Sequence, residues 1–238
     1  MTPFLALCRK EIASTLRSPG TWMLLGGFQF LAAVFFLIIL GTTNSSDLTG
    51  LYFDLGVLLL FLAPILTAAG FGAEWRDGTM ELLLTASLRP SHLVIAKFLA
   101  AVSVLALALL FSAQFPFWVW LLGQLDPGVA AGGLTGAFLL GSAVAAMGVF
   151  AAAATRSVPG AATLGFALAM AFWFLHSLGL VFGLEEGGGT DRFSLYLRFG
   201  LFTKGVVDTG DVAFFVLLAT AFLVLATASL EGARSARS

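Results

Sequence analysis

The sequence predicts an all-α membrane protein with six transmembrane helices. Of its 238 residues, 59% are apolar and only 11% are charged, whereas soluble domains carry about 25% charged residues. A helix needs about 20 apolar residues to cross a bilayer, and its backbone must satisfy its own hydrogen bonds in lipid. Six windows without any acidic or basic residue meet this length: 18–46, 55–73, 98–125, 127–155, 157–184 and 212–230.

The composition also excludes other classes of protein. A single cysteine, Cys8, rules out a disulfide scaffold. A net charge of −1 provides no basic field for nucleic acid. The 24 phenylalanines and 5 tryptophans argue against disorder. We therefore expect a single transmembrane domain over residues 1–238, with membrane lipid as a partner and no nucleic acid.

Residues 1–20 predict a helix that lies in the cytoplasmic interface of the membrane. Apolar side chains recur there at helical spacing, at Phe4, Leu5, Cys8, Ile12 and Leu16. Arg9, Lys10 and Glu11 fall together on the other side, which is the pattern of an interfacial helix. The alternative is a plain cytoplasmic tail that only helps to set the topology.

The topology follows from the even number of spans and from the basic residues. Six spans place both termini on one side, and nine of the twelve Lys and Arg residues then share that side. The positive-inside rule therefore predicts cytoplasmic termini and a multi-pass protein of the cell (inner) membrane. The longest cytoplasmic loop is 74–92, and the longest outer loop is 185–211. No A-x-A cleavage site follows the first span, so we expect that span to be retained.

The loop 74–92 is the most informative segment. Glu74, Gly78 and Glu81 are four and three residues apart and would share one face of a continuous helix. A break at Gly78 is equally consistent, since Thr79 is a good cap for a following helix. So short a loop cannot by itself bury the apolar run Leu82-Leu83-Leu84. The run needs lipid headgroups, neighbouring helices or a partner protein.

Two further patterns concern packing. In the window 127–155, Gly132 and Gly136 form a G-x-x-x-G, which lets helix backbones approach closely in lipid. In the outer loop, side chains at helical spacing predict amphipathic helices before the last span: Leu195, Phe199, Phe202 and Val206. These helices either close the outer end of the bundle or contribute to a translocation path.

Few residues in the spans carry chemistry. Gln29, Gln114 and His176 are polar groups inside apolar windows, where they either join helices or line a pathway. The sequence has no Walker A motif and no metal-binding cluster, so we expect neither ATPase activity nor a cofactor in this chain. An intramembrane serine protease using Ser142 and His176 is disfavoured, because Ser142 lies in L-G-S-A rather than in the G-x-S-G of such enzymes.

A family resemblance is carried by the loop. The stretch E-x-x-x-G-T-x-E-L-L-L-T at 74–85 resembles the first cytoplasmic loop of type-2 ABC transporter permeases. The nearest groups are the gliding-motility and nitrous-oxide-reductase-maturation permeases. The resemblance continues into the third span and returns at 205–212, where G-V-V-D-T-G-D-V precedes the last span.

The resemblance implies a function that composition alone does not. Such permeases pair with a second copy or a related permease and dock a separate ABC ATP-binding subunit, which binds the ATP and Mg. It implies an exporter whose coupling helix in the first cytoplasmic loop contacts the ATPase. Mapped onto this chain, the coupling residues are Glu74, Gly78, Thr79, Glu81, Leu82, Leu83 and Leu84. The competing interpretation is a membrane scaffold that transports nothing.

Overall fold

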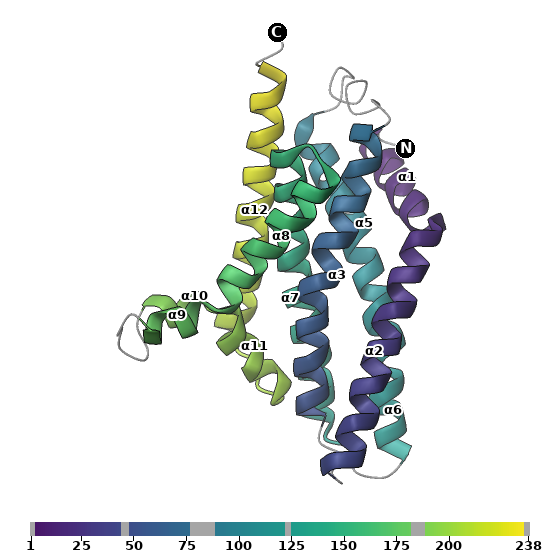
Figure 1. The fold of residues 1–238 in the computed structure, drawn as a ribbon, viewed down its shortest axis with the longest axis vertical. Coiled ribbons are helices and arrows are strands. Elements are labelled where there is room, and N and C mark those ends of the chain that lie inside the picture. The colour runs from purple at the N-terminus through teal and green to yellow at the C-terminus, as the bar shows by residue number, and fades with distance from the viewer. Residues whose placement is uncertain (1–2, 44–47, 77–88, 122–124, 182–188, 236–238) are drawn as a thin grey trace.

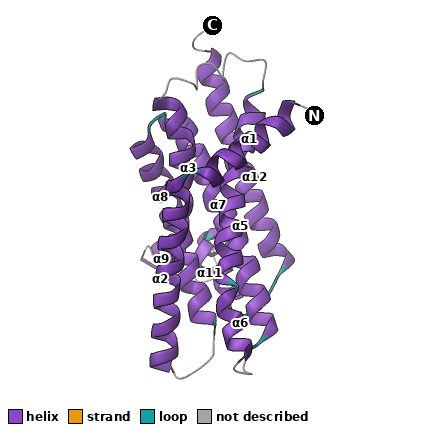
Figure 2. Cartoon of the chain, turned by 90° about the vertical axis from the view of Figure 1, so that its right-hand side faces the viewer, coloured by secondary structure: helices purple, strands orange, loops and turns teal. Residues whose placement is uncertain are grey.

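The computed structural model describes residues 3–43, 48–76, 89–121, 125–181 and 189–235. Within these ranges the chain is helical, with short connections and no strand. Most helices run along the long axis of the molecule (Figures 1 and 2). The helices are α1 Pro3–Arg17, α2 Pro19–Thr43, α3 Thr49–Arg76, α5 Pro90–Ser112, α6 Gln114–Leu121, α7 Pro127–Thr155, α8 Val158–Trp173, α9 Leu175–Val181, α10 Gly189–Phe193, α11 Leu195–Thr203 and α12 Thr209–Ser235.

Five described segments are long and apolar enough to cross a membrane: Pro19–Gly41, Thr49–Phe71, Pro90–Leu121, Pro127–Thr155 and Thr209–Gly232. The third of them joins α5 and α6, which are separated only at Ala113. These five agree with five of the six predicted windows. The chain is therefore a helical, multi-pass membrane protein by the length and composition of its helices.

The window 157–184 differs from the prediction. Its helix α8 has 16 residues, which corresponds to about 24 Å of helix against a hydrocarbon core of about 30 Å. The helix stops at Trp173, and α9 and α10 then extend sideways from the bundle (Figure 1). A charge-free window of sufficient length thus contains a bend, so six full-length spans are not found among the described residues. Nevertheless, α1 and the C-terminal end of α12 lie at the same end of the bundle (Figure 1).

The centre of the bundle is α7, which packs against α3, α5, α8, α11 and α12. Its N-terminus is fixed by Asp126, whose Oδ1 accepts hydrogen bonds from the amides of Gly128 at 2.8 Å and Val129 at 3.4 Å. Pro127 at the first helical position needs no such partner, since it has no N–H. The single charge between the third and fourth predicted spans therefore caps the central helix.

Small residues let the neighbours of α7 approach its backbone. A Cβ atom added to Gly133 would overlap the ring of Tyr52 in α3, and one added to Gly136 would overlap Phe202 in α11. Tyr52 and Phe202 are both fully buried. The G-x-x-x-G stretch thus packs inside the chain, where Gly136 and the intervening Gly133 make room for two aromatic rings and Gly132 makes room for the backbone at Gly205.

The helix at the N-terminus is present, but its buried face differs from the predicted one. Leu7, Cys8 and Glu11 are buried, whereas Leu5, which was assigned to the apolar face, is 53% exposed. Glu11 follows Leu7 by four residues and Cys8 by three, so the three side chains share one helical face. The prediction that Glu11 lies on the polar side with Arg9 and Lys10 was wrong. Glu11 can be buried because Lys97 on α5 compensates its charge.

Helix α11, which belongs to the predicted outer loop, packs into the bundle. Leu195, Phe199 and Phe202 are completely buried, as their helical spacing indicated. Val206 lies beyond the end of α11 and is 52% exposed, so the helix is shorter than the pattern suggested. Ser194 caps α11 through a hydrogen bond that its Oγ accepts from the amide of Leu197 at 3.4 Å.

Candidate functional site

The candidate site is the junction of α1, α3 and α5 beside the loop 74–92. Its first element is an ion pair between Glu11 of α1 and Lys97 of α5, with 2.7 Å between Oε2 and Nζ. The two side chains are only 5% and 7% exposed. The other carboxylate oxygen of Glu11 accepts a hydrogen bond from Lys10 Nζ at 3.1 Å. A buried carboxylate is tolerated here because both of its oxygens are bonded to ammonium groups.

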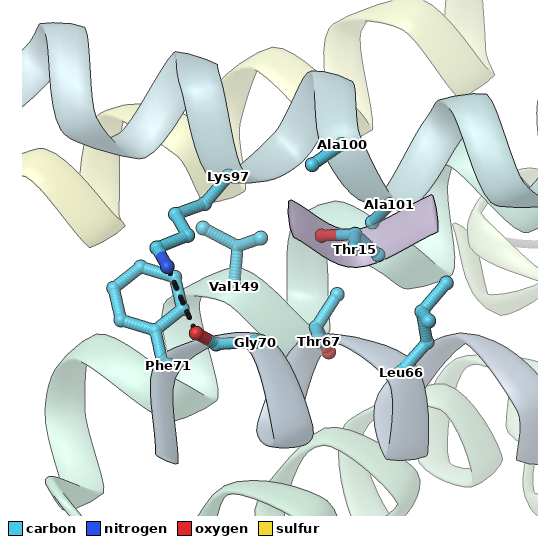
Figure 3. A pocket seen from close by; sticks show the side chains of 9 residues that line it. All are labelled: Thr15, Leu66, Thr67, Gly70, Phe71, Lys97, Ala100, Ala101 and Val149. Carbon is cyan, nitrogen blue, oxygen red and sulfur yellow. Dashed lines mark hydrogen bonds between the residues drawn. The ribbon is translucent and has the colours of Figure 1, made fainter. Parts of the chain in front are cut away.

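Lys97 also joins α3 to this pair. Its Nζ donates a hydrogen bond to the carbonyl oxygen of Gly70 at 2.8 Å and lies 5.6 Å from the centre of the Phe71 ring (Figure 3). In a regular α-helix the carbonyl of residue 70 accepts the amide of residue 74. The lysine is therefore bonded one helical turn before Glu74, at the point where α3 leads toward the loop.

The electrostatics of the junction favour the ionised pair. Burial by itself raises the pKa of Glu11, but the charges and hydrogen bonds of Lys97 and Lys10 outweigh it and leave that pKa below its usual value. Burial raises the pKa of the neighbouring Cys8 thiol. At neutral pH, Glu11 is thus a carboxylate and Cys8 an unreactive thiol.

Two spaces adjoin the ion pair. A cavity of about 10 Å³, close to the space that one water molecule needs, lies between Lys97, Phe71, Thr67 and Thr15 (Figure 3). A larger groove of about 530 Å³ runs between α1, α2 and α3. Its polar lining comes chiefly from α1 and the start of α2, while Met23, Leu24 and Leu66 make its wall apolar farther along.

The structure describes only part of the predicted coupling site. Glu74 lies in the last turns of α3, and its side chain is outside the described residues. Gly78, Thr79, Glu81, Leu82, Leu83 and Leu84 also lie outside them. What the structure places is the base of the loop, where α3 ends at Arg76 and α5 begins at Pro90.

The three predicted pathway residues are not brought together. Gln29 of α2 donates from Nε2 to the carbonyl oxygen of Ala108 at 2.6 Å and to Ser112 Oγ at 3.1 Å, so it links α2 to α5. Gln114 is the exposed first residue of α6. His176 lies in α9, with 2.7 Å between its Nδ1 and Oδ1 of Asp191 in α10. Among the described residues, no hydrogen bond joins any two of these three side chains.

Sequence reasoning missed two charge pairs. Glu11 was assigned to the polar side of the N-terminal helix, and Lys97 was one of the nine basic residues counted for the topology. The available signal was the position of Lys97, a single lysine inside the apolar helix α5, since a charge at that place requires a partner. The second pair joins Arg198 of α11 to Asp211 of α12, and the guanidinium also lies 4.4 Å from the centre of the Phe214 ring.

Comparisons with known proteins do not assign this chain to a family. No protein-family model matches the sequence, and no curated protein matches it. The fold defines an all-helical membrane protein with five helices of spanning length among its described residues. It carries a buried charged junction at the base of the loop 74–92.

Proposed function

We propose that this chain is the permease subunit of an ATP-driven transporter of the type-2 ABC kind, and that it works as an exporter. The observation that carries the proposal is the loop 74–92. Its motif, from Glu74 to Thr85, resembles that of a coupling loop, and Lys97 joins the helices at its base to one another. The absence of a Walker A motif from the chain accords with a separate ATP-binding subunit.

The junction supports this function through its mechanics. Helix α3 leads into the loop and α5 leads out of it. A force applied to the loop is therefore transmitted to the membrane through these two helices. Because Lys97 bonds to Gly70 of α3 and to Glu11 of α1, these helix ends are held in one unit. Movement of the loop is then passed on to three helices together. Such a push changes the state of the permease only if the ATPase contacts the two states differently.

The proposal also includes the partners. The ABC subunit binds the loop and supplies the ATP and Mg²⁺, while this chain contributes no nucleotide ligand. A second permease, either a copy or a related chain, completes the pathway, and membrane lipid surrounds both. The long helices α2 and α12 leave the largest share of their surface uncovered, with 17% and 22% of their spanning windows buried. Their exposed apolar faces suit contact with lipid or with the second permease.

We further propose six passes with both termini in the cytoplasm. Two observations support an even number of passes: α1 and the end of α12 share one end of the bundle, and α8 runs back from the end of α7 (Figure 1). In this topology the fifth pass lies in the predicted window 157–184, which begins with α8, and Arg192 falls in the outer loop 185–211. Cysteines introduced at Arg17, Arg192 and Glu231 of a Cys8→Ser protein test it. An impermeant maleimide should label only position 192 in intact cells.

Affinity purification in a mild detergent tests the function directly. We expect mass spectrometry of the eluate to find a soluble subunit with a Walker A motif, at one copy for each permease. The eluate should hydrolyse ATP. If the chain is recovered without any ATPase, the transport proposal fails and a scaffold role becomes the better explanation.

A further inference from the structure

A second cavity lies at the end of the bundle opposite the α1 junction. It has a volume of about 500 Å³ and lies between the end of α2, the start of α3 and α11. Pockets of about 300–1,000 Å³ are typical of small-ligand sites. The cavity shares no lining residue with the junction of α1, α3 and α5.

Both signs of charge line this cavity. Asp54 lies within the second turn of α3, inside a spanning segment, and Lys204 lies just after α11. Within the described part of the chain, neither side chain forms an ion pair. A carboxylate accepts hydrogen bonds from a primary ammonium, and a lysine ammonium binds phosphate. A ligand with one group of each sign therefore complements both residues.

The rest of the lining fits an amphiphilic ligand. Phe53 and Tyr196 meet edge to face, with 5.5 Å between their ring centres, and both line the cavity beside Asp54. Aromatic rings attract cations, so they reinforce a site for an ammonium group. Ile39, Leu197 and Leu201 make the cavity wall apolar, as an acyl chain requires.

We propose that this cavity binds a zwitterionic phospholipid with a primary amine, of the phosphatidylethanolamine type. The amine lies at Asp54 and the two rings, the phosphate lies at Lys204, and the acyl chains pass along Ile39 and Leu201. A quaternary choline headgroup fits less well, because it has no N–H to donate to the carboxylate. A phosphatidylglycerol has no cation for Asp54 at all.

Gly200 provides a way to block the cavity without disturbing the protein. It lies in α11 and lines the cavity, and a Cβ atom added there meets no atom within 4 Å. Alanine is a better helix former than glycine, so Gly200→Ala should fold at least as well. A larger side chain in Gly200→Phe would project into the space that the proposed lipid occupies.

Native mass spectrometry of the purified full chain tests the proposal. The protein is equilibrated with an equimolar mixture of phosphatidylethanolamine, phosphatidylcholine and phosphatidylglycerol, without nucleotide. We expect the wild-type chain to retain phosphatidylethanolamine preferentially. Asp54→Asn should reduce that preference about tenfold, which is the size expected for one charge-assisted hydrogen bond. Lys204→Gln and Gly200→Phe should reduce retention of the lipid.

Matched variants separate this site from general lipid contact. Glu231→Gln and Arg17→Gln remove exposed charges elsewhere, and Gly200→Ala changes the cavity least. All three should retain the wild-type lipid pattern, and every variant should keep the wild-type helical circular dichroism. Soluble phosphoethanolamine should not compete, because it lacks the acyl chains. Equal lipid patterns in the wild-type, Asp54→Asn and Gly200→Phe proteins would overturn the proposal, as would full competition by phosphoethanolamine.

This inference does not depend on the proposed transport function. Lipid retention is measured with no ATPase and no transport step. A failed lipid test would leave the copurification result unchanged, and loss of the ATPase partner would leave the lipid pattern unchanged.

Discussion

Glu11 and Lys97, which are 86 positions apart in the sequence, meet in an ion pair 2.7 Å long that is almost sealed from solvent. The lysine reaches across to the Gly70 carbonyl as well. The pair therefore does more than neutralise a buried charge. It fixes the N-terminal helix against the two helices that carry the loop 74–92.

Breaking the pair should destabilise the protein strongly. Lys97→Met leaves a buried carboxylate with only Lys10 as a partner, and such changes cost about 3–5 kcal/mol. The double change Glu11→Met with Lys97→Met should recover most of that loss, since no charge is then left buried. Thermal unfolding in detergent measures both. A double variant that is as unstable as the single one would show that the two residues are not coupled.

The contribution of the pair should depend on pH. The folded-state pKa of Glu11 is below its usual value of 4.5. The stabilisation is therefore complete above that unfolded value and is lost as the pH falls through the lower, folded value. We expect the difference in melting temperature between wild type and Glu11→Gln to be constant near neutral pH and to shrink in acid. A difference that grows in acid would contradict this assignment.

Cys8 should report whether α1 is docked. The thiol is 7% exposed and burial raises its pKa, so its reaction with a maleimide at neutral pH should be slow in the native protein. Glu11→Gln weakens the docking of α1 and should accelerate the labelling. The exposed Arg9→Gln variant serves as the control and should label at the wild-type rate. Equal rates in the Glu11 variant would mean that α1 stays docked without the pair.

Gly133 should tolerate no side chain. A Cβ atom there overlaps the Tyr52 ring, so Gly133→Ala forces the ring or the helix to move and should cost about 1–3 kcal/mol. Gly27→Ala in α2 is a matched control, because a Cβ atom at Gly27 has nothing within 4 Å. In a helix interior that change should stabilise by up to about 1 kcal/mol. Melting temperatures of the two variants should therefore move in opposite directions.

The loop itself should bind the ATPase. Glu81→Lys or deletion of Leu82–Leu84 should abolish recovery of the ATP-binding subunit, while the chain still inserts into the membrane. Insertion is controlled by the apolar helices, none of which these changes touch. Membrane fractionation and copurification measure the two properties separately. Undiminished copurification and transport in both variants would place the coupling contact elsewhere.

Much of the fold was predictable because the residues of each helix indicate that helix by their own hydropathy and spacing. Freedom from charge over about 20 residues marked five of the six windows correctly as helices of spanning length, because that signal does not depend on the neighbouring helices. The glycines of α7 likewise indicated a close approach of neighbouring helices. The spacing of Leu195, Phe199 and Phe202 indicated a buried helical face. The bend after Trp173 was not predictable in this way, because α9 departs from α8 inside an uninterrupted apolar window.

The candidate site could be predicted only in part. The loop motif was visible in the sequence as a pattern of adjacent residues, whereas Lys97 and Glu11 belong to two separate helices and have no common pattern. Similarly, Asp54 and Lys204 are far apart in the chain and line one cavity only because α11 folds back onto α3. Gln29 and His176 were visible in the sequence as polar groups, but their hydrogen-bond partners were not.

The sequence by itself determined that this chain is a helical membrane protein. Hydropathy and the hydrogen bonding of the backbone within a helix are local properties of each segment. The tertiary structure decided which charges are buried together, which glycine faces which ring, and where cavities remain. Those relationships arise between segments that are distant in the chain, and only the packing of one helix against another defines them.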